Sequence, residues 1–284
     1  MQKNNFKSLI MAVTAADVNK LRQKTGAGMM DCKKALEESN GDFELAIELL
    51  RKKGAKIAAN RQDRDANEGC VVAKVSDDKK KGVLLFVNCE TDFVAKNEEF
   101  QQFAYSVAQI AVEKSPANID ALKALPYNSE ITVNDKFMEQ MGKIGEKIDV
   151  SYYETVNAEE VVAYNHPGNR LACIVGFSKQ TTEEISKSIA MQVASMNPVS
   201  VDKDDVDQKI LDKELDIARE TTRQEGKPEE MVEKIALGKL NKFFKECTLL
   251  NQEFFKDSKL TVRQYLEQSD KGLQVKGFKR LSLI

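Results

Sequence analysis

The chain has 284 residues, enough for roughly two domains of about 150 residues each, and 42% of its residues are hydrophobic, so a sizeable core can form. Its 43 Lys and Arg nearly balance 45 Asp and Glu, which excludes a chain-wide electrostatic footprint for nucleic acid or an anionic membrane and leaves only a local patch. No apolar run approaches the ~20 residues of a bilayer span, and residues 9–13 are too short for a signal-peptide core, so we expect a soluble, cytoplasmic protein.

The cysteines and the single histidine, His166, restrict the chemistry that the chain can carry. No pair of the five cysteines has the spacing of a metal finger or a redox motif. A catalytic dyad or triad would have to use His166, and residues 142–147 resemble a phosphate-binding loop only superficially because its hydroxyl residue is missing. We therefore predict no catalytic residue, no metal site and no cofactor.

A compact helical domain is predicted at the N-terminus, over residues 1–56. Thr14 has capping-box spacing before a first helix, and a glycine-rich break precedes a second helix over residues 29–39. A third helix follows, and we expect it to end near Gly54 because glycine commonly terminates helices. The charged residues 57–68 are predicted to form a linker.

Two copies of one pattern, a strand followed by a helix and a proline, cover residues 83–116 and 171–198. They predict a core of two related α+β subdomains, residues 69–158 and 159–284. Two helices joined by a tight turn predict a hairpin inserted in the second subdomain at about 203–250. The expected fold class is therefore α+β and multidomain. The strands expected in the core are residues 70–75, 83–89, 149–156, 161–164, 171–177 and 274–284.

The junction between strand and helix differs between the two copies and gives the sharpest candidate site. The first copy reads Thr-Asp-Phe-Val-Ala at 91–95, whereas the second is wholly polar. Phe93 lies outside the periodic apolar face that starts at Phe100. Two interpretations are open: Phe93 packs under the following helix as a staple, or it is exposed beside Asp92 as a probe for a partner's pocket.

Met29 and Met30 begin the second predicted helix, directly after a Gly-Ala-Gly break. Adjacent helix positions point ~100° apart, so we expect one of the two to face the core and the other to face outward, where methionine suits an adaptable interface. His166 precedes Pro167, a position typical of a turn.

Two long runs of the sequence are distinctive. Residues 25–36 read Thr-Gly-Ala-Gly-Met-Met-Asp-Cys-Lys-Lys-Ala-Leu, and residues 87–96 read Val-Asn-Cys-Glu-Thr-Asp-Phe-Val-Ala-Lys. Both resemble signatures of the bacterial elongation factor Ts family, and weaker matches in the same order extend the resemblance over nearly the whole chain. The resemblance implies a three-helix ubiquitin-associated-like N-terminal domain, two related α+β core subdomains and an inserted antiparallel coiled coil.

The resemblance also implies a function. The family's members are guanine-nucleotide exchange factors for the GTPase elongation factor Tu, which they bind in its GDP-bound and nucleotide-free forms without making or breaking a covalent bond. Asp92 and Phe93 match the pair that wedges into the partner's GTPase domain and disturbs its Mg²⁺ and phosphate site. Thr91 and Val94 flank this pair in the same signature. The resemblance implies no enzyme activity, no direct nucleic-acid contact and no membrane.

Further residues are implied in the same partner surface. Arg22, Met29 and Met30 match positions that dock on a helix of the partner's GTPase domain, and Ile144 and His166 match core positions near the interface. The resemblance leaves open whether the chain forms a homodimer or a heterotetramer with its partner.

Two other functions compete with the one that the resemblance implies. The lysines within residues 52–56 and 79–81 would suit a ribosome- or RNA-associated binding protein, although interleaved acidic residues oppose it. Cys89 would be the nucleophile of a thiol enzyme, although no activating neighbourhood is evident. The chain also departs from many family members by stopping at Ile284 without a C-terminal helix, and Met11 offers a second start for translation.

Overall fold

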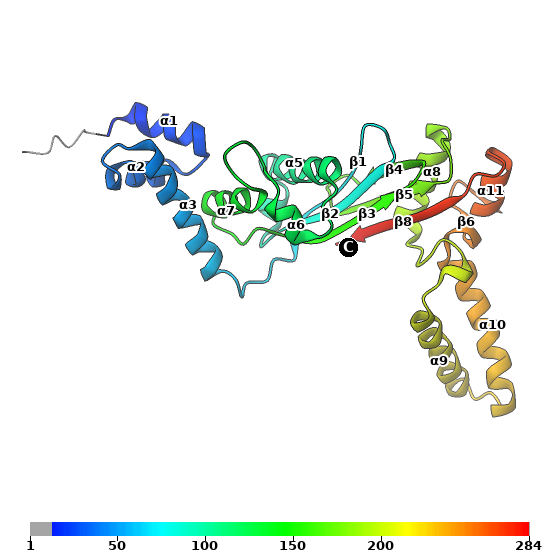
Figure 1. Cartoon of the computed structure of the whole chain (residues 1–284). Helices are drawn as coiled ribbons and strands as arrows, with labels where there is room; N and C mark the ends of the chain where they lie inside the picture. Colours follow the sequence, from blue (N-terminus) through cyan, green and yellow to red (C-terminus); the bar gives the residue numbers. More distant parts are fainter. Residues whose placement is uncertain (1–12, 284) are drawn as a thin grey trace, which may run out of the picture. The chain divides into compact units, whose positions relative to one another are not determined.

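The computed structural model describes residues 13–283, and the alternative start at Met11 lies outside them. Figure 1 shows their helices and strands. They divide into two compact units. Unit 1 comprises residues 13–70, 87–110 and 116–151, and unit 2 comprises residues 71–86, 111–115 and 152–283. The fold is α+β, as predicted: the described residues contain eleven α-helices and several small sheets. None of the helices within 13–283 is both long and apolar enough to span a membrane.

Unit 1 begins with three helices, α1 (Ala15–Thr25), α2 (Met29–Glu38) and α3 (Phe43–Asn60). The predicted capping box is confirmed: the Thr14 side chain accepts a hydrogen bond from the Asp17 amide, and the Asp17 carboxylate accepts one from the Thr14 amide. The three helices bury a small shared core. Its buried members are Val18, Leu21, Ala27, Cys32, Ala35, Leu36, Ala46 and Ile47.

The prediction that the third helix ends near Gly54 is wrong. Helix α3 continues to Asn60, and Gly54 is buried in its interior. A methyl group added to Gly54 would lie 2.3 Å from the carbonyl oxygen of Met138, in helix α7 (Val133–Ile144). Glycine therefore serves a close helix crossing here, not a helix stop, because only a residue without Cβ lets the two backbones approach so closely.

In unit 1, α7 packs on the helix that carries Phe103 through a pair of aromatic side chains. Phe103 and Phe137 meet edge to face with ring centroids 5.1 Å apart, a favourable aromatic geometry. Helix α7 starts with a capping box from Thr132 and ends at Gly145, whose φ of 82° is the left-handed conformation typical of a helix C-cap. The other helices are α4 (Asp92–Ala95), α5 (Glu98–Lys114, whose last turn belongs to unit 2) and α6 (Ile119–Ala124).

In the described part of the chain, the strands form two three-stranded sheets and a two-stranded ribbon. The first sheet has the order β1-β2-β3, with β1 (Glu68–Val75), β2 (Lys81–Cys89) and β3 (Asp149–Asn157). The second has the order β4-β5-β8, with β4 (Glu160–Asn165), β5 (Leu171–Phe177) and β8 (Val275–Ser282). Sequence analysis did not find the ribbon of β6 (Glu253–Phe254) and β7 (Asp257–Thr261), because strands this short show no alternation.

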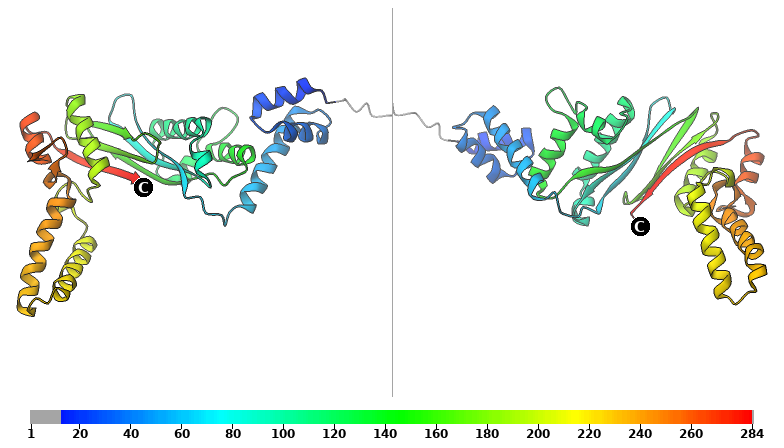
Figure 2. Two further views of the ribbon diagram at one scale, coloured as in Figure 1. Left: turned by 180° about the vertical axis from the view of Figure 1, so that it is seen from behind. Right: turned by 60° about the horizontal axis from the view of Figure 1, so that its bottom comes forward.

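The second sheet is antiparallel and carries the core of unit 2. Glu160 of β4 lies opposite Phe177 of β5, and Leu171 of β5 lies opposite Ser282 of β8. Helix α8 (Glu183–Met196) lies along this sheet (Figure 2). The core between them also takes in α11 (Val262–Ser269). Its fully buried members include Cys173, Val175, Phe177, Ile189, Val193, Leu249 and Val262.

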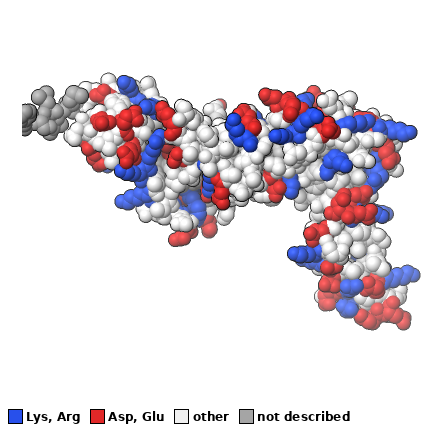
Figure 3. Space-filling model, viewed as in Figure 1, with Lys and Arg blue, Asp and Glu red and all other residues white. Residues whose placement is uncertain are grey.

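The predicted helical hairpin is present in unit 2 as α9 (Gln208–Gln224) and α10 (Glu229–Cys247). The two helices lie side by side around small buried residues such as Ala218 and Ala236. Acidic and basic side chains are interspersed over the hairpin surface (Figure 3), and Arg219 bridges α9 to Glu233 of α10 with Nε–Oε2 at 2.8 Å. Two short 3₁₀ turns, Lys203–Asp205 and Leu249–Asn251, flank the hairpin.

Removing α9 and α10 and joining the ends with a short glycine-rich linker is expected to leave the rest of unit 2 folded. No hairpin residue belongs to the unit 2 core described above. The flanking segments are already tied together, since the Leu249 amide donates to Ser200 O at 3.0 Å and the Leu250 amide donates to Val201 O at 2.9 Å. Thermal unfolding followed by circular dichroism checks this. Loss of the cooperative transition would show instead that the hairpin belongs to the core.

Candidate functional site

The Asp92–Phe93 pair lies on α4, a single helical turn that directly follows the buried strand β2. Thr91 caps this turn, with its Oγ1 accepting from the Val94 amide at 3.4 Å. Phe93 is 83% exposed, so the interpretation that it packs under the next helix is wrong. The buried member of α4 is Ala95, and a residue two positions before it points ~200° away around the helix, which turns the Phe93 ring to solvent.

The start of α4 is held by the carboxylate of Glu146. Glu146 Oε2 accepts from the amides of Glu90 and Thr91, each at 3.0 Å, and Oε1 accepts from Thr91 Oγ1 at 2.7 Å. Charge-assisted hydrogen bonds of this kind are stronger than neutral ones. Sequence analysis missed Glu146. No local signal in the sequence marks it, because the residues that it binds lie more than 50 positions earlier in the chain.

The Glu90 carboxylate in turn accepts a hydrogen bond from the segment that follows Glu146. Glu90 Oε1 accepts from the Lys147 amide at 2.6 Å and from Arg61 Nη1 at 2.6 Å. Burial alone would raise the pKa of Glu90, but the hydrogen bonds from Lys147 and Arg61 outweigh it and hold that pKa below its usual value. The segment after β2 and the segment after α7 thus exchange carboxylate-to-amide bonds and fix one another.

Asp92 stands beside the exposed ring as an ionised carboxylate. Lys96 Nζ donates to Asp92 Oδ2 at 2.6 Å, an i,i+4 pair on the same short helical segment. This hydrogen bond lowers the pKa of Asp92. Val94, on the other side of Phe93, is half-buried. The turn therefore presents one large apolar ring and one negative charge next to each other.

Met29 and Met30 both face solvent, with 55% and 63% of their surface exposed. The prediction that one of them is a core residue is wrong. They occupy the first turn of α2, whose buried residues start only at Cys32, so the helix begins before it reaches the core. Arg22 is exposed as well. Sequence analysis underestimated how much of this end of the helical domain is uncovered.

The turn between α1 and α2 lies against the C-terminal end of α7. A methyl group added to Gly26 would lie 3.5 Å from the Lys143 side chain. Ile144, the last residue of α7, is half-buried. Lys143 Nζ also pairs with Glu99 Oε2, at 2.5 Å, on the first turn of α5. The end of α7 thus contacts both the turn before the methionines and the segment around α4 within unit 1.

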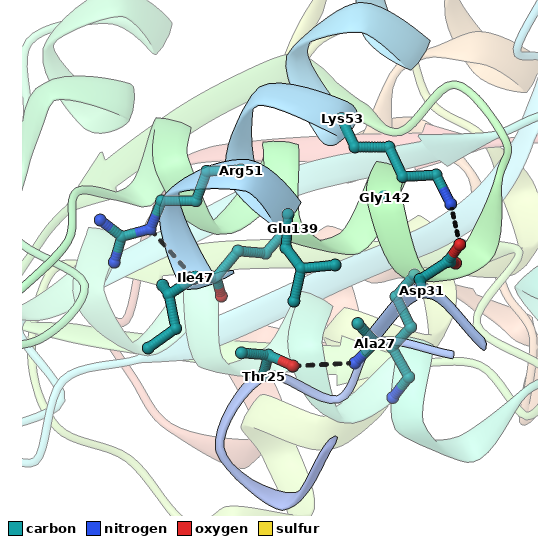
Figure 4. Close-up of a pocket in the computed structure, with 10 residues that line it drawn as sticks. Thr25, Ala27, Asp31, Ile47, Arg51, Lys53, Glu139 and Gly142 are labelled. Carbon is teal, nitrogen blue, oxygen red and sulfur yellow. Dashed lines mark hydrogen bonds and ion pairs between the residues drawn. The ribbon is translucent and has the colours of Figure 1, made fainter. Parts of the chain in front are cut away.

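A small cavity of about 20 Å³ lies between the N-terminal helices and α7 (Figure 4). Lys53 Nζ pairs with Asp31 Oδ1 at 2.5 Å on one side of it. Arg51 Nε, which is buried and has no hydrogen-bond partner among residues 13–283, lies 3.8 Å from Glu139 Oε1 on the other side. The volume suits a single bridging water. The Lys53–Asp31 pair ties α3 to α2, and the Arg51–Glu139 pair ties α3 to α7.

His166 belongs to unit 2, whereas the other predicted site residues all belong to unit 1. It is exposed on the turn between β4 and β5, and its Nδ1 lies 2.9 Å from the Tyr164 hydroxyl. Gly168 adopts a φ of 88° in the same turn, consistent with a tight hairpin connection. The turn position predicted for His166 is therefore confirmed, while its place in a partner surface stays a prediction.

The thiols lack the properties of nucleophiles. Burial, assisted by the nearby Glu146 charge, raises the pKa of Cys89 to about 12, and its Sγ donates to Thr91 O at 3.2 Å. Burial also raises the pKa values of Cys70 and Cys173 to about 12. No group of three or more His, Cys, Asp or Glu residues that could hold a metal ion occurs within residues 13–283. These observations weaken the thiol-enzyme alternative.

Comparisons with known proteins agree along nearly the whole chain. The family model described as Elongation factor TS matches residues 90–283. The protein named Elongation factor Ts from Amoebophilus asiaticus is 53% identical over 95% of this chain and 99% of its own length. Those of the same name from Christiangramia forsetii and Porphyromonas gingivalis are 51% and 49% identical, over 95% and 96% of this chain and 98% and 99% of theirs. The chain belongs to the elongation factor Ts family.

Proposed function

We propose that the protein is a guanine-nucleotide exchange factor that binds elongation factor Tu in its GDP-bound form and promotes the release of GDP. It acts by binding alone, without a covalent step, a cofactor or a metal of its own. Family membership supports this function, and the translation machinery that it serves would place the protein in the cytoplasm. The partner surface includes Asp92, Phe93, Met29 and Met30.

The observation that carries the proposal is the exposed Phe93 ring on a short helix whose start is fixed. A large aromatic side chain that is 83% exposed gains free energy when a partner covers it, about 1.5–3 kcal/mol for complete burial. The carboxylate ties from Glu146 and Glu90 hold the turn beneath it. An ordered aromatic anchor of this kind is typical of interface residues that dominate binding.

The mechanism follows from linkage between two ligands of the same partner. If Phe93 inserts only when the partner's nucleotide site is distorted, the exchange factor binds nucleotide-free elongation factor Tu more tightly than its GDP complex. By reciprocity, GDP then binds the complex more weakly by the same factor. The ionised Asp92 beside the ring would act on the same side, near the partner's Mg²⁺ and phosphate groups.

Several finer assignments accompany this proposal. Arg22, Met29 and Met30 form a second contact with the partner's GTPase domain, and Ile144 and His166 lie near the interface. The three N-terminal helices are a ubiquitin-associated-like domain, and α9 and α10 form a coiled coil that contacts another protein surface.

A ribosome- or RNA-associated function receives less support from the charges. Lys53 and Lys80, from the two lysine-bearing segments, are paired with Asp31 at 2.5 Å and with Glu159 at 3.3 Å. Paired lysines release fewer counterions on binding a phosphate backbone than free ones do. Figure 3 likewise shows acidic side chains interspersed among the basic ones on the face in view.

The test is the release of a fluorescent GDP analogue from elongation factor Tu, chased with excess unlabelled GDP. Catalytic amounts of this protein are expected to accelerate release, and the rate is expected to saturate as elongation factor Tu is increased. Removing Mg²⁺ with a chelator, without the exchange factor, gives a positive control for release. Tight binding without acceleration would make the protein a binding partner only, and absence of both would contradict the proposal.

A further inference from the structure

The exposed Phe93 ring has little packing of its own, so its direction depends on the backbone of α4. This helix has only four residues, Asp92–Ala95, and one buried side chain, Ala95. A single turn of helix is marginal in isolation because nucleation is unfavourable. If the turn frays, an exposed ring samples many directions, and ordering it on contact with a partner costs part of the binding free energy.

The strongest tie that this turn makes to the rest of the chain comes from a distant residue. The carboxylate of Glu146 takes three donors, the amides of Glu90 and Thr91 and the Thr91 hydroxyl, at 2.7–3.0 Å. Weaker ties come from Cys89 Sγ, which donates to Thr91 O at 3.2 Å, and from Gln101 Nε2, which donates to Ala95 O at 3.1 Å. Both are hydrogen bonds between neutral groups, one from a thiol and one from a side-chain amide, so neither is charge-assisted.

Glu146 is itself held in place, so the tie is stiff. It follows the helix C-cap Gly145, and the next residue, Lys147, donates its amide to Glu90 and its Nζ to Gln62 O at 2.7 Å and to Arg64 O at 3.0 Å. We propose that Glu146 is a positioning residue that acts through Thr91 to present the Phe93 ring in one orientation. This inference rests on the proposed exchange function and deepens it.

Nucleotide exchange provides the first test. Glu146→Ala removes all three bonds, and we expect it to slow GDP release from elongation factor Tu by roughly tenfold or more, since hydrogen bonds to a charged group are the strong ones. Glu146→Gln keeps an acceptor for the two amides without the charge, so a smaller loss, about threefold, is expected. The control is Glu48→Gln, which removes a carboxylate that pairs with Lys52 on the exposed side of α3; its exchange rate should be unchanged.

A double-mutant cycle separates positioning from a general loss of stability. In a Phe93→Ala background the ring is gone, so Glu146→Ala is expected to slow exchange by less than about twofold. An equal fractional loss in both backgrounds would overturn the inference and leave Glu146 with a structural role only. A normal rate in Glu146→Ala, alongside a slow rate in Phe93→Ala, would overturn the inference while leaving the proposed function intact.

A readout without the partner covers the case in which the proposed function itself fails. The chain has no tryptophan, so Phe93→Trp introduces a single fluorescent reporter at the site. Adding Glu146→Ala is expected to lower the steady-state anisotropy of that tryptophan, whereas adding Glu48→Gln is expected to leave it unchanged. Equal anisotropy in all three proteins would overturn the inference.

Discussion

Gly54→Ala is expected to destabilise the protein, although alanine is normally the better helix residue. The added methyl would lie 2.3 Å from the Met138 carbonyl oxygen and 3.1 Å from its carbonyl carbon. Both atoms belong to the backbone of α7, which cannot yield without moving the helix. Overpacking of this kind costs ~1–3 kcal/mol or more, which exceeds the ~1 kcal/mol that alanine gains in helix propensity.

Two other helical glycines provide matched controls for the same substitution. Gly142, on the α7 side of the crossing, has 3.3 Å between its added methyl and the Gly54 Cα, so Gly142→Ala should cost less. Gly238 lies inside α10 with no atom within 4 Å of its added methyl, so Gly238→Ala should stabilise the chain by roughly 0.5–1 kcal/mol. The three variants are therefore expected to differ in sign as well as in size.

Denaturant titration followed by circular dichroism measures the free energy of unfolding for each variant. Each kcal/mol of net loss would lower the melting temperature by about 2–4 °C in a chain of this size. If Gly54→Ala were as stable as the parent, the two helices would not cross as closely as the structure has them, and α7 would not be the platform on which the N-terminal helices rest.

Local signals in the sequence predicted most of the elements. Helix caps such as Thr14 and the strand–helix copies require only neighbouring residues, and the structure contains them where expected. Gly54 shows the limit of such signals. A glycine among helix-forming residues is compatible with a stop or with a crossing, and only Met138, a residue of another helix, decides between them.

In the candidate site, too, the sequence predicted some features and not others. The contrast between the two copies at residues 91–95 was sufficient to single out Phe93, but its exposure depends on which member of α4 is buried. For Met29 and Met30, periodicity predicted that one would be exposed, but it did not predict that both are. Periodicity places residues around a helix and does not say where along the helix the core begins. Glu146 could not be found, since the two residues that it binds, Glu90 and Thr91, precede it by more than 50 residues of chain.

Phe93→Ala is expected to slow nucleotide exchange by about tenfold or more while leaving stability unchanged. A ring that is 83% exposed contributes little to the folded state, so its removal should not shift the unfolding transition. The ring's burial against a partner would supply ~1.5–3 kcal/mol, which corresponds to roughly 10- to 150-fold in an equilibrium or rate. The substitution therefore tests the proposed function without changing the fold.

The control is Phe255→Ala, which removes another exposed phenylalanine, 40% accessible and located in unit 2. It should leave the exchange rate unchanged, because the proposal assigns exchange to the Phe93 ring and not to exposed phenylalanine rings in general. Phe93→Leu, which keeps apolar volume at the same place, is expected to lose less than Phe93→Ala. Fluorescent GDP release and thermal unfolding are measured on all three variants. A normal exchange rate in Phe93→Ala would show that Phe93 does not act as a wedge. Partner binding would then have to come from other surfaces, such as the exposed methionines of α2.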